Sequence, residues 1–156
     1  MRTPIPGNLP EDIDGKNTNP KDMIGSDKLP LHLIPTPALA EVSLAFLEGA
    51  LKYGTANWRV AGVRASIYRA ADQRHGQKWW NGQDRDPKTR VHHLASLIAC
   101  YMIILDAELA GKLTDDRPPS VDAAAHIDAL EETVKHLKEL FKDHHPHHYT
   151  IKDTQP

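Results

Sequence analysis

Four segments of the chain carry apolar residues at the helical spacing of three to four, and this pattern most constrains the fold. No segment shows the alternation of apolar and polar residues that predicts a strand. We therefore expect an all-α protein, a compact bundle of about four helices with irregular ends. The predicted helices run from Thr36 or Pro37 to just before Gly54, from about Arg64 to Trp80, from about Pro87 or Lys88 to Ala110, and from about Val121 to Lys142.

Stretches rich in proline, glycine and polar residues divide the chain. Most of the 12 prolines lie near its two ends. Residues 1–18 predict a flexible N-terminal arm, and residues 19–119 predict the helical core. Residues 120–142 predict a C-terminal helix for packing or oligomerisation, and residues 143–156 form a His-rich tail in which we expect no catalytic metal.

The third and fourth predicted helices have different apolar surfaces. The third is apolar around much of its circumference between Leu94 and Leu105, which predicts burial on several sides. The fourth carries a narrow apolar seam from Ile127 to Phe141, which suits one partner helix in this chain or in another. The seam and the small size together predict a homo-oligomer with sites near its interfaces.

Composition excludes several functional classes. The sum of Lys and Arg is 19 and that of Asp and Glu is 21, so a net charge of −2 argues against a broad nucleic-acid-binding surface. A single cysteine excludes an intramolecular disulfide and a Cys-rich zinc site, and it fits a reducing cytoplasm. The N-terminal residues contain no apolar signal segment, and the longest apolar run is too short to span a bilayer. We therefore expect a cytoplasmic protein without membrane contact.

The segment YGTANWRVAGVRAS at 53–66 is the densest in side chains that could bind a ligand. The Asn57 amide, the Trp58 indole and the guanidinium of Arg59, with Arg64 nearby, could read a base or hold a phosphate. The alternative is a rigid loop between helices with Trp58 packed into the core. Composition alone favours this structural alternative.

A second segment, RHGQKWWNGQDRDP at 74–87, precedes the third predicted helix. Asp84 and Asp86 could stabilise a helix N-terminus or could bind Mg²⁺ or Mn²⁺, since hard cations prefer carboxylate oxygens. His75 and His93 could be ligands, general bases or buried structural imidazoles. Glu48 shares a stripe with Glu41, which is more typical of a solvated face than of a metal site.

Several well-known catalytic motifs are absent from the sequence. There is no GxxxxGK[ST] phosphate loop, no GxGxxG and no GxSxG. The dipeptide His-Asp does not occur, which weakens a metal phosphohydrolase of the HD type. The literal ExxE…ExxD spacing of all-α nucleotide pyrophosphohydrolases is also missing.

Several segments together resemble the bacteriophage dATP/dGTP diphosphohydrolase family (MazZ-like). They cover roughly residues 19–119 and comprise NPKDMIGSDKLPLHLIP, EGALKYGTANWR, GVRASIY, RH, WWNGQDRDP, VHHLA and DDRPP. The resemblance implies an all-α, metal-dependent hydrolase of phosphoric anhydrides, related to the MazG-type nucleotide pyrophosphohydrolases. Such an enzyme would cleave dATP or dGTP to the monophosphate and pyrophosphate, and would adjust the nucleotide pool for phage DNA synthesis in the host cytoplasm.

The resemblance also implies roles for individual residues. Its motif maps onto Lys21, Asp22, Lys28, Glu48, Lys52, Tyr53, Asn57, Trp58, Arg59, Arg74, His75, Asp86 and His93. We expect catalytic roles for Glu48, His75, Asp86 and His93. We expect Mg²⁺ or Mn²⁺ to be held by Glu48, Asp84 and Asp86, with Asp106 as a further candidate. The predicted substrate-binding residues are Lys21, Asp22, Lys28, Lys52, Tyr53, Asn57, Trp58, Arg59, Arg64 and Arg74.

One position departs from the family pattern. The family usually has Glu after the glycine, where this chain has Gly82-Gln83, and a glutamine cannot supply the negative charge of a metal-binding carboxylate. An alternative function is therefore a catalytically weakened nucleotide-binding or accessory phage protein. A DNA-associated accessory protein is disfavoured by the net charge. We also expect the segment 19–35 to fold over the site.

Overall fold

The computed structural model describes residues 21, 25 and 27–154, and two units follow from its contacts, residues 1–39 and residues 40–156. The predicted site residue Asp22 lies outside the described residues. In the first unit, Gly25 accepts a backbone hydrogen bond from Lys28, and a 3₁₀ turn, η1, spans Leu31–Leu33. The described side chains of this unit, including Lys28, are exposed.

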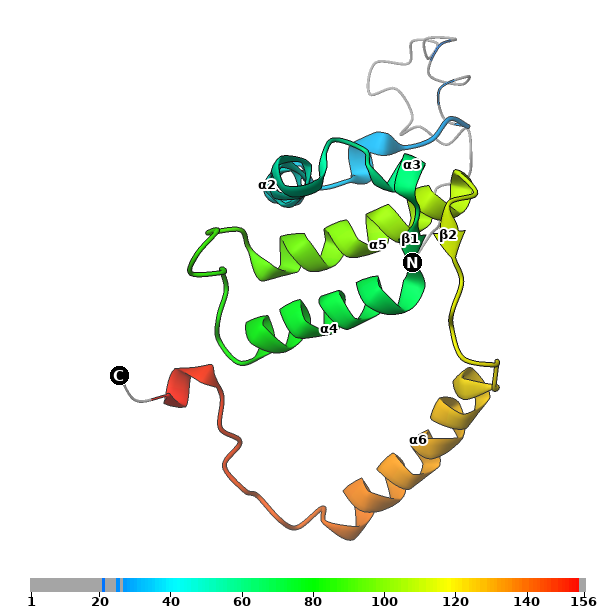
Figure 1. The fold of residues 1–156 in the computed structure, drawn as a ribbon. Coiled ribbons are helices and arrows are strands. Elements are labelled where there is room, and N and C mark those ends of the chain that lie inside the picture. Colours follow the sequence, from blue (N-terminus) through cyan, green and yellow to red (C-terminus); the bar gives the residue numbers. More distant parts are fainter. Residues whose placement is uncertain (1–20, 22–24, 26, 155–156) are drawn as a thin grey trace, which may run out of the picture. The chain divides into compact units, whose positions relative to one another are not determined.

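The second unit is built mainly from helices (Figure 1). They are α2 (Thr36–Tyr53, which begins in the first unit), α3 (Trp58–Ala61), α4 (Ala65–Trp80), α5 (His93–Leu109) and α6 (Ala123–Leu140), followed by the 3₁₀ turn η2 (Ile151–Asp153). The predicted all-α fold is confirmed. No described helix is long and apolar enough to cross a bilayer.

The ends of α2 and α4 follow from local sequence, as predicted. Gly54 follows α2 with φ +92°. Glycine adopts this conformation with little strain, because it has no Cβ atom. Asn81 caps the C-terminus of α4, and Gly82 follows it with φ +94°. The helices therefore end where the glycines allow the chain to turn.

A short parallel pair of strands was not predicted. β1 (Val63–Arg64) pairs with β2 (Leu113–Thr114) in the register Val63↔Leu113. Gly62 precedes β1 with φ +77°, and a Cβ there would lie 2.8 Å from the Lys112 carbonyl oxygen. Glycine at 62 therefore lets the two chain segments approach closely enough to pair.

The third helix starts later than expected. The sequence predicted a start at about Pro87 or Lys88, whereas α5 begins at His93. The Asp86 carboxylate accepts hydrogen bonds from the backbone N–H groups of Lys88 and Thr89, and Arg90 adopts φ +63°. These features close a turn instead of a helix, because a left-handed residue interrupts the helical ladder.

α4 and α5 form an antiparallel pair, and α2 packs on another face of α5 (Figure 1). The small core between α2 and α5 contains Val42, Val91, Ala95 and Ala99, with Phe46 packed against it. The prediction that the third helix is buried on several sides is only partly correct. One side of it stays open, since Leu105 is 57% exposed.

Candidate functional site

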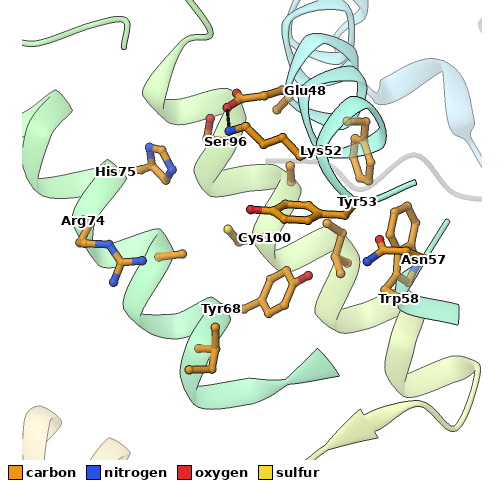
Figure 2. A pocket seen from close by; sticks show the side chains of 17 residues that line it. Glu48, Lys52, Tyr53, Asn57, Trp58, Tyr68, Arg74, His75, Ser96 and Cys100 are labelled. Carbon is orange, nitrogen blue, oxygen red and sulfur yellow. Dashed lines mark hydrogen bonds and ion pairs between the residues drawn. The ribbon is translucent and has the colours of Figure 1, made fainter. Parts of the chain in front are cut away.

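A pocket of about 460 Å³ lies between α2 and α4, with α5 behind both (Figure 2). This size is typical of a small-molecule site. Seven of the predicted catalytic or substrate-binding residues line it, and they come from α2, from the connection to α3 and from α4. These residues are Glu48, Lys52, Tyr53, Asn57, Trp58, Arg74 and His75.

The charged side chains of the pocket come from opposite walls. On α2, Lys52 is ion-paired with Glu48, and the hydrogen bond from this pair raises the pKa of Lys52. On α4, the Arg74 guanidinium points toward the pocket (Figure 2), and it has no ion-pair partner among the described residues. Two cations against one carboxylate suit an anionic ligand.

Two histidines contact each other near the C-terminal end of α4. His75 on α4 and His93 at the start of α5 approach through their Nδ1 atoms at 2.9 Å. His93 is fully buried, and its Nε2 lies 2.8 Å from the Gln83 side-chain oxygen. The His93 backbone N–H donates to the Asp84 carbonyl oxygen at 2.8 Å, which fixes the first turn of α5 against the loop that carries Gln83.

These contacts assign the protons on both rings. The Gln83 oxygen can only accept, so His93 Nε2 carries the proton and, in a neutral ring, His93 Nδ1 is an acceptor. His75 must then donate from Nδ1, which leaves its Nε2 without a proton. The hydrogen bonds from Gln83 through His93 therefore hold His75 as a neutral imidazole with a lone pair on Nε2. His75 lines the pocket.

Burial favours the neutral form of both rings. Desolvation is the main cause that lowers the pKa of His75, and His93 lowers it further. Desolvation likewise lowers the pKa of His93, with Lys78 as the next cause. Neutral rings at pH 7 are what the assigned pattern of protons requires.

These pKa shifts predict that acid destabilises the fold. Unfolded histidine titrates near about pH 6.5, so the unfolded chain takes up protons first as the pH falls below that value. The contribution of the two neutral rings is complete above about pH 6.5 and is lost below it. We expect the free energy of unfolding, measured with urea, to be lower at about pH 5.5 than at about pH 7.5. A His75→Gln, His93→Gln double variant should lose part of this slope, and an unchanged slope would contradict the assignment.

Aromatic side chains also line the pocket. Trp58 packs on Phe46 with ring centroids 5.8 Å apart, and its indole N–H donates to Asp106 at 2.6 Å. Tyr53 extends into the middle of the pocket beside Cys100 (Figure 2). Trp58 therefore packs on the core and also lines the pocket, and its contact with a base stays a prediction.

Asp106 and Arg59 are brought together, although neither lines the pocket. Arg59 donates from Nε and Nη2 to the two carboxylate oxygens of Asp106, at 2.8 and 2.7 Å. The Arg59 hydrogen bond, with that of Trp58, lowers the pKa of Asp106 to about 2. Asp106 thus holds α3 on α5. Arg64, another predicted substrate-binding residue, pairs with Asp116 at 3.5 Å, away from the pocket.

The four predicted metal ligands do not gather into one centre. Glu48 lines the pocket, whereas Asp84 and Asp86 lie in the loop before α5. Backbone N–H groups of Thr89 and Lys88 lower the pKa of Asp86, and Lys78 lies 4.0 Å from it. In the described part of the chain, no three His, Cys, Asp or Glu side chains come together in a way that could hold a metal ion.

The sequence did not single out every pocket residue, and two of the predicted substrate-binding residues that the structure describes fall in the other unit. Lys21 and Lys28 belong to the first unit. Tyr68, Ser96 and Cys100 line the pocket, but no role in the site was predicted for any of them from the sequence, although Tyr68 ends the family-like segment GVRASIY. Helical spacing from His75 and His93 would have indicated the faces of α4 and α5 on which they lie.

A second cavity, of about 920 Å³, lies beside β2 between α4 and α5. The two guanidinium groups that line it are already paired. Arg69 donates to Asp72 at 3.0 Å, and Arg117 donates to Asp115 at 2.6 Å. The smaller pocket is the better candidate, because its guanidinium and its imidazole lone pair are available to a ligand.

The helical fold thus holds a pocket lined by two cations and a neutral histidine, an arrangement that suits a small anionic ligand. A family model described as "dATP/dGTP diphosphohydrolase, N-terminal" matches residues 18–117, more than half of the 156 residues. The chain belongs to this family, as its sequence motifs indicated, and the family name denotes a hydrolase of the phosphoanhydride bonds of dATP and dGTP. No match was found among curated proteins or among solved structures.

Proposed function

We propose that this chain is a deoxynucleoside triphosphate pyrophosphohydrolase that converts dATP and dGTP to the monophosphate and pyrophosphate. The observation that carries the proposal is the position of His75. His75, whose Nε2 carries no proton, lines the same pocket as the Lys52–Glu48 pair and as Arg74, which has no ion-pair partner among the described residues. A base beside two cations is the arrangement that hydrolysis of a triphosphate requires.

In this proposal, His75 Nε2 accepts a proton from a water molecule as its oxygen attacks the α-phosphorus. The new bond joins that oxygen to the α-phosphorus, and the bond from the α-phosphorus to the bridging oxygen breaks. Pyrophosphate leaves with the electron pair. Arg74 and Lys52 offset the charge of the phosphates, and Tyr53 offers a ring face to the purine.

The direct test is to incubate the full chain with each of the four deoxynucleoside triphosphates and to separate the products by ion exchange. The proposal expects monophosphate and pyrophosphate from dATP and dGTP. Orthophosphate without pyrophosphate, or no turnover of any nucleotide, would count against it.

We also propose that activity depends on Mg²⁺ or Mn²⁺, since a triphosphate carries several charges that a hard cation neutralises. Glu48 is the predicted ligand that lines the pocket, and the described residues do not complete a metal centre around it. We expect EDTA to abolish turnover and an excess of Mn²⁺ or Mg²⁺ to restore it. Full activity in EDTA would contradict the requirement.

A phage context, a cytoplasmic location in the host and a homo-oligomeric state complete the proposal. The substrates, which are precursors of DNA synthesis, support the first two. The apolar seam from Ile127 to Phe141 supports the third.

The alternative, a catalytically weakened nucleotide-binding or accessory protein, depends on Gln83. The Gln83 oxygen accepts a hydrogen bond from His93, and glutamate at this position would also accept it. This geometry favours a competent enzyme, because the interaction needs an acceptor and not a charge.

Substitutions at Gln83 separate the two functions. We expect Gln83→Glu to leave the turnover of dGTP within about threefold of the natural chain, a change of under 1 kcal/mol in the barrier. Gln83→Leu removes the acceptor and should lower turnover by about 10- to 100-fold, as losses of orienting partners do. If the natural chain is inactive and Gln83→Glu gains activity, the accessory function is correct.

A further inference from the structure

The C-terminal helix α6 carries an apolar seam that nothing covers among the described residues. Ile127, Leu130, Val134, Leu137 and Phe141 follow one another at spacings of three and four. They are between 47% and 63% exposed, and every residue of α6 is exposed. Most of the stability of a helix in a protein comes from packing of its apolar face, so a partner along this seam would stabilise α6.

The type of side chain at each seam position indicates the partner. In a heptad register, the β-branched Ile127 and Val134 occupy the a positions, and Leu130 and Leu137 occupy the d positions. β-Branched residues at a with leucine at d favour two parallel strands in a coiled coil. A second copy of the same helix presents the same residues at the same heights, which makes the seam self-complementary.

The residues that flank the seam agree with this pairing. In a parallel, in-register pair, His126 at g of one copy lies across from Glu131 at e of the other. On the outward face of α6, Lys135 donates to Glu132 at 2.6 Å, and Lys142, just after the helix, donates to Glu139 at 2.6 Å. These pairs leave the seam as the apolar surface of α6.

A lipid surface is a poorer match for the same seam. Helices that lie on anionic membranes are rich in Lys and Arg on the polar face. The polar face of α6 carries four carboxylates, those of Asp128, Glu131, Glu132 and Glu139, against two lysines, Lys135 and Lys138. The negative balance would repel an anionic membrane.

We propose that α6 is an interface between two copies of this chain, paired in parallel and in register along Ile127, Leu130, Val134 and Leu137. α6 lies outside residues 18–117, which the family model matches. The interface does not depend on the catalytic proposal, and its test uses molecular mass instead of turnover.

Light scattering of the full chain tests the interface. The double variant Val134→Asp, Leu137→Asp places two charges in the seam and should halve the mass of the natural assembly, to 17.4 kDa if that assembly is a dimer. The control Ala129→Asp, His136→Asp carries the same charges on the outward face and should keep the natural mass. A natural chain that stays at 17.4 kDa, or a seam variant that keeps the natural mass, would overturn the proposal.

Cysteine cross-linking tests the orientation. In a Cys100→Ser background, Leu137→Cys places the two introduced thiols opposite each other and should give a disulfide-linked dimer on mild oxidation. Glu132→Cys, on the outward face, should not. A Leu137→Cys chain that stays unlinked would overturn the parallel register, and so would equal linking at both positions. A monomeric chain that sediments with phosphatidylserine vesicles would assign the seam to lipid and overturn the pairing.

Discussion

Replacing His75 by glutamine is expected to reduce the turnover of dGTP and dATP by about 10²- to 10⁴-fold, the usual contribution of a general base. Glutamine keeps a hydrogen-bond donor toward His93 but has no basic nitrogen to accept a proton from water. Initial rates of pyrophosphate release, measured at saturating nucleotide, check the expected loss.

The matched control for this prediction is His136→Gln, because His136 is an exposed histidine on the outward face of α6. Its turnover should equal that of the natural chain. Circular dichroism should show that both variants keep the natural helix content. A His75→Gln variant that retains at least a tenth of the activity would exclude His75 as the base.

Replacing His93 by alanine is expected to destabilise the fold by about 2–5 kcal/mol. His93 is fully buried, so its removal leaves a cavity between α4 and α5. It also leaves the Gln83 oxygen and His75 Nδ1 without their partner. The free energy of unfolding from urea titration at pH 7 checks this expectation.

The control for the His93 variant is His136→Ala, which removes an imidazole from the exposed face of α6 and should leave the free energy of unfolding unchanged. The His93→Ala variant should also lose turnover, because His75 would no longer be held in one tautomer. An unchanged free energy of unfolding in His93→Ala would contradict the hydrogen bonds of the buried His93 with Gln83 and His75.

Where local sequence determines the structure, the helices could be predicted. The C-terminal ends of α2 and α4 lie where Gly54 and Asn81-Gly82 placed them. The start of α5 could not be predicted, because hydrogen bonds from Lys88 and Thr89 to Asp86 compete with the helix. The strands β1 and β2 have only two residues each, too few to show a period of two.

Much of the pocket could be predicted from the motifs in residues 48–58 and 74–75. The partners of these residues could not, because they depend on contacts distant in sequence. Asp106 stands 47 residues after Arg59, and their pairing assigns Asp106 to the anchoring of α3. Gln83 was noted as a departure from the family pattern, but its contact with His93 follows only from the folded loop.

The most direct test of the central claim is hydrolysis of dGTP in water enriched in oxygen-18, with both products analysed by mass spectrometry. Attack of water on the α-phosphorus in the His75 pocket predicts one labelled oxygen in dGMP and none in pyrophosphate. A His75→Gln reaction followed for the same time should yield about 10²- to 10⁴-fold less labelled dGMP. Label in pyrophosphate, or the absence of any hydrolysis by the natural chain, would contradict the account.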